Sequence, residues 1–306
     1  MPSGERADDR PVIVPSAGRD FRRMRGEQRR AGMSYVIGRG FCAARDALAR
    51  GLIALRVTPN HLSAAGLLLT LVAAGALLRG AGQDWGQTPA GRWPAPVWAG
   101  VFLVLAAACD MLDGAVARLG RLGSAIGTVL DSTLDRAGDL VIYLAIAAHF
   151  AWRGNVTHAV LAVVALANSN LISYVKARAE NLIPDCSVGY WLRGERFAAL
   201  LIAAFSAHVP GVLWQQAISP AFTVLRRVRW TVLVLEARRT GHPDPQAGPS
   251  AGWRGWLHPW RFPRGSLPYD LVTGTNIAYI VFGQWLWPAL DGRWDPLRSW
   301  LDAWTA

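Results

Sequence analysis

Long apolar runs separated by short polar connectors dominate the chain after about residue 60. Within these runs the apolar residues form continuous blocks, and they do not alternate with polar residues as in half-buried strands. Several blocks approach the roughly 20 residues that a helix needs to cross a bilayer, once their polar ends are included. The pattern predicts an all-α integral membrane protein. We expect a bundle of six transmembrane helices, at about 62–79, 96–118, 124–149, 157–179, 196–213 and 215–235.

The N-terminal region has a different pattern. Residues 1–33 are polar and arginine-rich, which is typical of a disordered arm. In 34–56 the apolar residues fall roughly on one side of a predicted helix, whereas Arg39, Arg45 and Arg50 fall largely elsewhere. This predicts an N-terminal amphipathic juxtamembrane helix that lies on an anionic leaflet. A soluble helix packed on the domain that follows is the alternative.

Pro59 separates this helix from the membrane region, and Asn60 or Ser63 can cap the helix that follows. We divide the chain into a cytoplasmic arm with its interfacial helix (1–56), a membrane domain (57–236), and a linker with a hydrophobic C-terminal extension (237–306). The apolar stretch 271–290 in the extension fits a seventh span, a re-entrant segment or an interfacial helix, and the sequence does not distinguish among these.

Composition agrees with a membrane protein. Of the 306 residues, 52% are hydrophobic and 17% are charged, against about 25% charged residues in soluble proteins. The net charge of +11 fits either nucleic acid or an anionic membrane surface. We favour the lipid bilayer and expect no nucleic-acid partner, because the apolar blocks are long. The three cysteines are far apart, so they predict neither a disulfide framework nor a zinc site.

The arginines are unevenly distributed among the connectors. They concentrate in the N-terminal arm and in 119–123, 176–196 and 226–239, whereas 80–95 and 150–156 carry few. By the positive-inside rule, the N-terminus and the arginine-rich connectors face the cytoplasm. Arginine-rich and arginine-poor connectors alternate along the chain, as expected if each predicted helix crosses the membrane once. We therefore expect a multi-pass protein of the cell inner (cytoplasmic) membrane.

Aspartates gather where the second and third predicted helices meet. Asp110 and Asp113 are three residues apart and Asp131 and Asp135 are four apart, so each pair shares one helix face. The loop between the helices is short and contains glycines, so an antiparallel hairpin brings the four carboxylates together. Aspartates that each cap a helix or pair with an arginine are the alternative, but that explanation does not account for four in this arrangement.

Buried carboxylates need a counter-charge. Each aspartate at membrane depth costs about 2.5–3.5 kcal/mol, and four together also repel one another. Two divalent cations would supply the charge, and carboxylate oxygens suit Mg²⁺ or Mn²⁺. Such a pair stabilises the attacking and leaving oxygens of a displacement at phosphorus. Gly114 leaves space beside the carboxylates for a substrate, and Arg118 can offer a planar fork to phosphate.

The run Asp110-x2-Asp113-Gly114-x2-Ala117-Arg118-x8-Gly127-x3-Asp131-x3-Asp135 carries a family resemblance. It matches the signature of the CDP-alcohol phosphatidyltransferase family at every fixed position, and the resemblance covers about residues 57–236. The resemblance implies a six-helix membrane fold, a homodimer, and a polar cavity that opens to the cytoplasm. It also implies a reaction in which a phosphatidyl group passes from CDP-diacylglycerol (CDP-DAG) to an alcohol, releasing CMP.

The same resemblance implies roles for individual residues. Asp110, Asp113, Asp131 and Asp135 would ligate the metal ions, and Asp135 would also take the proton from the acceptor hydroxyl. The residues expected to contact CDP-diacylglycerol are Thr58, Pro59, Asn60, Gly114, Arg118 and Ser124.

The acceptor alcohol is expected near the end of the fourth helix. The run Ser-Tyr-Val-Lys-Ala-Arg-Ala-Glu at 173–180 resembles the phosphatidylinositol phosphate synthases of the family, whose acceptor is inositol phosphate. Lys176 is the single lysine among 32 basic residues, which indicates that a compact ammonium is needed there; chance survival of one lysine is the alternative. The residues expected to bind the anionic acceptor are Lys176, Arg178, Arg193 and Arg196.

One position departs from the synthase pattern. Those enzymes usually carry Glu-Arg-x-x-Arg, but here Glu195 and Arg196 are followed by Phe197, Ala198 and Ala199, so the second arginine is missing. Inositol phosphate is the favoured acceptor, and glycerol 3-phosphate, which would give phosphatidylglycerol phosphate, is the alternative.

Two other classes of protein fit parts of the pattern. A cation-coupled transporter also places aspartates inside a membrane, but such transporters tend to show repeated halves and broken helices, and we see no internal repeat. A non-catalytic scaffold is the other class. The presence of all four aspartates argues against it, so we expect an enzyme.

Overall fold

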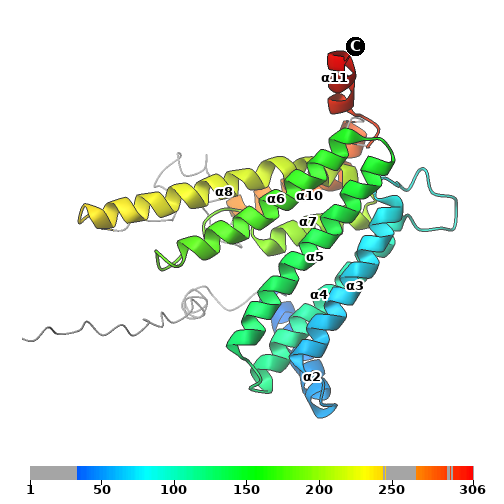
Figure 1. Ribbon diagram of the computed structural model, residues 1–306. Helices are drawn as coiled ribbons and strands as arrows, with labels where there is room; N and C mark the ends of the chain where they lie inside the picture. Colours follow the sequence, from blue (N-terminus) through cyan, green and yellow to red (C-terminus); the bar gives the residue numbers. More distant parts are fainter. Residues whose placement is uncertain (1–32, 244, 246–266, 288–289, 291, 306) are drawn as a thin grey trace, which may run out of the picture. The chain divides into compact units, whose positions relative to one another are not determined.

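The computed structural model describes residues 33–243, 245, 267–287, 290 and 292–305, and this part of the chain is helical and contains no strand (Figure 1). The chain divides into two units, Met1–Ala43 and Ala44–Ala306. Helix α2 (Met33–Ala54) contains the boundary between them. Within the second unit, Ala49 of α2 is buried in a small cluster with Leu62 and Val116. Except for Met33, the arm predicted at 1–33 lies outside the described residues.

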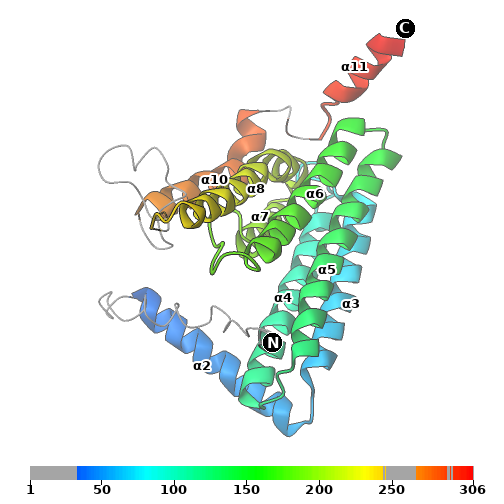
Figure 2. The same cartoon turned by 60° about the vertical axis from the view of Figure 1, so that its left-hand side comes forward.

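Four long helices form the centre of the second unit, and their bounds agree with the first four predicted helices to within a few residues. In both views α3 runs side by side with α4 and with α5 (Figures 1 and 2). The helices are α3 (Pro59–Gly80), α4 (Ala95–Leu119), α5 (Ala125–Trp152) and α6 (Val156–Ala179).

The starts of these helices follow from local chemistry. The Thr58 side chain accepts a hydrogen bond from the His61 amide in a capping box, so α3 begins at Pro59. The prediction that Asn60 or Ser63 would cap this helix was wrong, because a proline is favoured at the first helical position, and the cap is therefore the residue before it. In α5 the cap is Ser124.

The fifth predicted helix, 196–213, was wrong at its C-terminal end. Helix α7 (Arg193–Phe205) stops early and α8 (Val209–Arg239) begins soon afterwards. Ala207 has a φ of 52°, and the His208 amide donates to the Ala203 carbonyl at 2.8 Å, which is a left-handed helix cap. Pro210, in the first turn of α8, disfavours continuation of α7. The hydrophobic pattern missed this break because both sides of it are apolar.

Three helices, α3, α4 and α6, are long and apolar enough to cross a membrane. Within the described residues, α5, α7 and α8 are not among them. The physical reasons differ. Aspartates occupy the first half of α5, arginines occupy the second half of α8, and the 13 residues of α7 span only about 20 Å of a hydrocarbon core that is about 30 Å thick.

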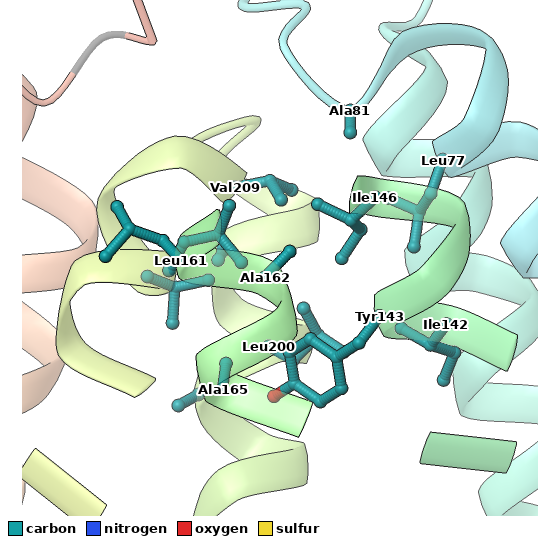
Figure 3. Close-up of a cluster of buried hydrophobic side chains, with 14 of the residues drawn as sticks. Leu77, Ala81, Ile142, Tyr143, Ile146, Leu161, Ala162, Ala165, Leu200 and Val209 are labelled. Carbon is teal, nitrogen blue, oxygen red and sulfur yellow. The ribbon is translucent and has the colours of Figure 1, made fainter. Parts of the chain in front are cut away.

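One apolar core joins α3, α4, α5, α6, α7, α8 and α10 (Figure 3). Leu77 of α3, Ile146 of α5, Ala162 of α6, Leu200 of α7 and Val209 of α8 are each at most 3% exposed. Alanines are frequent in this core, and small residues allow helices to approach closely in a membrane. The core therefore fixes the position of α7 relative to α5.

The C-terminal extension is helical where it is described. Helix α10 (Leu267–Leu286) packs against α7 and α8, and α11 (Pro296–Thr305) packs against α6. Polar contacts hold α10 in place. Gln215 donates to Asn276 at 2.6 Å, and Tyr279 donates to the Gly211 carbonyl at 3.1 Å. Of the stretch 271–290, residues 271–286 belong to α10, which packs on α7 and α8 and is not among the candidate spans of the described residues.

Asp295 connects the last helix to α6. Its carboxylate accepts hydrogen bonds from the amides of Val156 and Thr157 at 2.7 and 2.9 Å, from the Thr157 hydroxyl at 2.5 Å, and from the Arg298 amide at 3.2 Å. One side chain therefore caps the first turns of both α6 and α11. Partial burial raises the pKa of the Asp295 carboxyl, but the hydrogen bonds from Thr157, Arg298 and Val156 outweigh this effect and lower its pKa below the usual value.

We expect Asp295→Asn to lower the free energy of unfolding by about 1 kcal/mol, because the amide replaces one of the two acceptor oxygens with a donor and the hydrogen bonds to that oxygen are lost. Because the folded-state pKa lies below the unfolded one, the contribution is fully present above the unfolded pKa of about 3.9. It is lost as the pH falls through the folded pKa. The Tm difference between wild type and variant in detergent should therefore shrink in acid. Asp302→Asn is the matched control, because Asp302 is exposed and its Oδ2 lies 3.9 Å from Nε of Arg298. A Tm difference independent of pH would contradict this role.

Candidate active site

The hairpin of α4 and α5 brings the four aspartates to one cavity of about 330 Å³. Asp110 and Asp113 come from the last turns of α4, and Asp131 and Asp135 come from the first turns of α5. The predicted convergence of the carboxylates is therefore confirmed. The other residues that line this cavity, here called the aspartate cavity, include Ser63, Gly66, Thr70, Gly138, Arg193, Gly194 and Phe197.

Three of the carboxylates are close enough to share an ion. One oxygen from each of Asp110, Asp113 and Asp131 lies within 4.8 Å of the other two. Two like unit charges at that distance repel by about 3.5 kcal/mol at an effective dielectric constant of about 20. A set of carboxylate oxygens suits a hard divalent cation and not a soft one. The residues present therefore fit a divalent ion.

Arg193 enters the aspartate cavity from the first position of α7. Its Nη2 lies 2.5 Å from Oδ1 of Asp135, and its Nη1 lies 3.6 Å from Oδ2 of Asp110. The guanidinium therefore joins a carboxylate of α4 to a carboxylate of α5. Its side chain is 46% exposed, so it reaches the carboxylates from the open side of the cavity. It supplies positive charge at the point where the carboxylates would otherwise repel one another.

Helix α3 forms the opposite wall of the aspartate cavity. The Ser63 hydroxyl donates to Oδ2 of Asp113 at 2.7 Å, and Asp113 is the most buried of the four aspartates. Gly66 allows α3 to pack closely on α4, because a Cβ there would contact the Cβ of Cys109 at 3.4 Å. Sequence reasoning considered Ser63 only as a cap. A hydroxyl one turn inside an otherwise apolar helix was the available signal for its role at the site.

Behind the cavity lies a second polar cluster. Asp139, one turn beyond Asp135, accepts a hydrogen bond from the Ser169 hydroxyl at 2.5 Å and lies 4.0 Å from Arg196. The interpretation of Asp139 as a packing partner for a basic residue is confirmed. Arg196 is 4% exposed and donates to the Trp191 carbonyl at 3.3 Å, so it is held within the wall between α5, α6 and α7.

The two remaining basic residues expected at the acceptor lie elsewhere. Lys176 is in the last turn of α6, where its Nζ lies 3.6 Å from Oε1 of Glu180, and Arg178 is exposed on the same turn. Neither lines the aspartate cavity. Of the four basic residues predicted to bind the acceptor, the structure brings Arg193 to the aspartates and Arg196 to the layer behind them.

The residues expected to contact CDP-diacylglycerol lie at or near the ends of α3, α4 and α5. Thr58 and Ser124 are the N-caps of α3 and α5, and Pro59 and Asn60 form the first turn of α3. Arg118 is exposed in the last turn of α4, and a Cβ at Gly114 would lie 3.2 Å from Arg118 Nη1. The glycine therefore lets the guanidinium fold back along the helix. None of these six residues lines the aspartate cavity itself.

The C-terminal extension also reaches this region. The Tyr269 hydroxyl of α10 donates to Oε1 of Glu195 at 2.8 Å, and the Tyr190 hydroxyl donates to Thr273 at 3.1 Å. Glu195 lies two residues after Arg193, in the first turn of α7. Local sequence pattern does not predict these contacts, because they join residues 74 and 83 positions apart.

Comparison with known proteins agrees with this geometry. The family model described as CDP-alcohol phosphatidyltransferase matches residues 56–240. A phosphatidylinositol phosphate synthase from Mycobacteroides abscessus is 33% identical over 185 residues, which cover 60% of this chain and 78% of the relative.

Two crystal structures of the phosphatidylinositol phosphate synthase of Mycobacterium tuberculosis are similar, each with 26% sequence identity and a TM-score of 0.50. The one with CDP-DAG bound is matched over 60% of this chain and 92% of that chain. The one in complex with manganese and citrate is matched over 69% and 97%.

The matched region contains α3 to α8, the four aspartates and Arg193, and it leaves α10 and α11 outside. The chain belongs to the CDP-alcohol phosphatidyltransferase family, and it is a membrane phosphatidyltransferase of phospholipid biosynthesis.

Proposed function

We propose that the protein transfers the phosphatidyl group of CDP-diacylglycerol to a hydroxyl of inositol phosphate and releases CMP. The observation that carries this proposal is the aspartate cavity, in which carboxylates of α4 and α5 meet the guanidinium of Arg193. Similarity to phosphatidylinositol phosphate synthases supports the acceptor, and similarity to a structure with CDP-DAG bound supports the donor.

Asp110, Asp113, Asp131 and Asp135 would hold two divalent ions, Mg²⁺ or Mn²⁺. The close approach of three of these carboxylates supports a metal site, as does the manganese in the similar structure. When bound, the ions would neutralise charge that develops on the phosphate oxygens. The Ser63 hydroxyl fixes the orientation of Asp113 for this purpose.

Asp135 is the proposed general base. It would take the proton of the acceptor hydroxyl while the hydroxyl oxygen attacks the phosphorus on the lipid side, and the bond from that phosphorus to the CMP oxygen breaks. In the structure Asp135 is paired with Arg193 at 2.5 Å, so the guanidinium occupies one of its carboxylate oxygens. Movement of Arg193 onto the acceptor phosphate would free Asp135. Acceptor binding would thus leave the Asp135 carboxylate free to accept the proton of the hydroxyl.

The donor would lie toward the open ends of α3, α4 and α5. Arg118 is exposed there and can hold the diphosphate, with Gly114 leaving room for the guanidinium. Thr58, Pro59, Asn60 and Ser124 form the helix starts around it. Amides at helix N-termini favour negative charge, which supports this placement.

On the acceptor side, Arg193 is the proposed phosphate ligand, with Arg196 holding the wall behind it. Lys176 and Arg178 would contact the acceptor at the edge of the aspartate cavity. Glycerol 3-phosphate is the alternative acceptor, because Ala199 stands where the synthases usually have a second arginine. Both acceptors are anionic, which fits a guanidinium at the aspartates.

The proposals for topology and oligomeric state rest on the family and on the distribution of arginines along the chain. We propose a bundle of six helices, α3 to α8, in the inner membrane with α7 crossing only part of its thickness, the aspartates toward the cytoplasm, a homodimer, α2 as an amphipathic interfacial helix, and a catalytic domain over 57–236. The three apolar helices and the arginine-rich connectors support the membrane topology.

The acceptor panel is the main test. Purified protein with CDP-diacylglycerol and Mg²⁺ should release CMP only when a suitable alcohol is present. Inositol phosphate should be used in preference to glycerol 3-phosphate, serine and inositol, as measured by CMP release and by mass spectrometry of the lipid product. A chelator should stop the reaction. Preference for glycerol 3-phosphate would select the alternative, and transport of a cation without CMP release would overturn the enzyme assignment.

Asp135→Asn should reduce turnover by at least about 10³-fold, because removal of a general base and a metal ligand combines two effects. The fold should persist, since the amide is of similar size, and this is checked by thermal unfolding in detergent. Asp185→Asn is the matched control, because Asp185 is exposed and its carboxylate accepts hydrogen bonds from Ser187 in the same turn, outside the aspartate cavity. Turnover of Asp135→Asn within a few-fold of wild type would remove Asp135 from this role.

Arg193→Gln should raise the KM for the acceptor by about tenfold or more, with a smaller change in the KM for CDP-diacylglycerol, because a lost charge-assisted contact weakens phosphate binding. Lys176→Gln should also raise the acceptor KM, but by less, since Lys176 is paired with Glu180 outside the aspartate cavity. Steady-state kinetics with each substrate varied in turn gives both values. An acceptor KM unchanged in Arg193→Gln would place the acceptor phosphate elsewhere.

A further inference from the structure

A second hollow lies at the opposite end of the same helices. It has a volume of about 920 Å³ and is lined by the end of α3, the connector 81–94, the start of α4 and the residue that follows α5. In Figure 1 this connector extends from the end of α3 and α4 that is remote from the α4–α5 turn. Ala95, at this end of α4, is about 27 Å along the helix axis from Asp113. The reaction proposed above makes no use of it.

Three arginines from three different elements surround this hollow. Arg79 is in the last turn of α3, Arg92 is in the connector, and Arg153 follows α5. None of the residues that line the hollow is acidic. In the described part of the chain, no carboxylate lies within ion-pair distance of any of these three guanidiniums. Three cations without a carboxylate partner around one concavity form a site for an anion.

The helix dipole explains only part of this charge. Cations are favoured near helix C-termini, which accounts for Arg79 after the apolar part of α3 and for Arg153 after α5. Arg92 instead comes just before the N-terminus of α4, where the dipole disfavours a cation. A bound anion would satisfy Arg92 and the α4 terminus together.

The deeper wall of the hollow is apolar. Val72 and Ala76 lie one to two turns of α3 below Arg79, and Phe102 lies on the facing side of α4. At the rim, the rings of Trp93 and Trp98 lie 5.3 Å apart, and tryptophan is enriched where a bilayer meets water. A cationic rim above an apolar wall is complementary to an amphiphile, whereas a free anion would make no use of the wall.

The rim is held in place by specific contacts. The Gln83 side chain accepts a hydrogen bond from the Ala95 amide at 2.9 Å, and the Trp85 indole donates to the Phe205 carbonyl at 3.3 Å. Gly80 permits this fold of the connector, because a Cβ there would meet Gln83 at 2.6 Å. The connector is therefore tied to α4 and α7, and the hollow is formed before any ligand binds.

We propose that this hollow binds the phosphate headgroup of an anionic phospholipid. The phosphate lies among Arg79, Arg92 and Arg153, and an acyl chain runs along Val72, Ala76 and Phe102. The site is separate from the aspartate cavity, and no chemistry occurs there.

Native mass spectrometry of the full chain in detergent tests this site, with phosphatidylglycerol and phosphatidylcholine as probes. Wild type should retain phosphatidylglycerol in preference to phosphatidylcholine. The triple variant Arg79→Gln/Arg92→Gln/Arg153→Gln should bind phosphatidylglycerol on the order of 10- to 100-fold more weakly, since each basic group near a membrane contributes to attraction of anionic lipid. Unchanged thermal unfolding and unchanged CMP release show that the variant is folded; if the triple variant does not fold, Arg92→Gln alone, in the connector, should still weaken binding.

The matched control removes the same charge elsewhere, with Arg229→Gln/Arg238→Gln/Arg239→Gln at exposed positions of α8. This variant should keep the affinity of wild type for phosphatidylglycerol. Equal loss in both triple variants would mean that lipid retention follows net charge, and it would overturn the site. Competition by millimolar inorganic phosphate as effective as that by added lipid would assign the hollow to a free anion and would overturn the lipid assignment.

Discussion

Repulsion among carboxylates held close together in a helical hairpin is the constraint on which this structure depends. Asp110, Asp113 and Asp131 place oxygens within 4.8 Å of one another, where water cannot screen them fully. Such an arrangement is stable only with cations nearby. The protein supplies one of its own in Arg193, which lies between Asp110 and Asp135. The negative charge that remains makes this set of carboxylates fit a divalent ion.

The position of Arg193 is constrained, because its guanidinium balances the negative charge of the aspartates without filling the aspartate cavity. The short helix α7 does this. Its first residue reaches the aspartate cavity, its fourth residue, Arg196, is buried with Asp139, and its middle packs in the core through Leu200. Helix α10 adds a hydrogen bond to the first turn through Tyr269 and Glu195. Arg193, Arg196 and Leu200 share one face of α7 and Glu195 lies on another, so contacts on two sides of the helix fix the direction in which Arg193 points.

The long helices carry different chemistry at their two ends. At one end α4 and α5 expose carboxylates, and at the other end α3, α5 and the connector before α4 present arginines. Between these ends the helices are apolar and join in one core. A long-range attraction between the opposite charges is weak, because about 27 Å along the helix axis exceeds the Debye length of about 8 Å in physiological salt. The two ends can therefore bind different ligands without interfering with each other.

The sequence by itself determined the helical membrane class, the first four helices and the convergence of the aspartates. Those properties depend on short spacings: an apolar run gives a helix, and residues three or four apart share a face regardless of what packs on it. Only the tertiary structure decided the break at Ala207, the burial of Arg196 beside Asp139 and the pairing of Tyr269 with Glu195. Contacts of this kind join residues that are distant in sequence or depend on competing caps and packing. Local pattern therefore placed the carboxylates, whereas folding of the whole chain selected which arginine meets them.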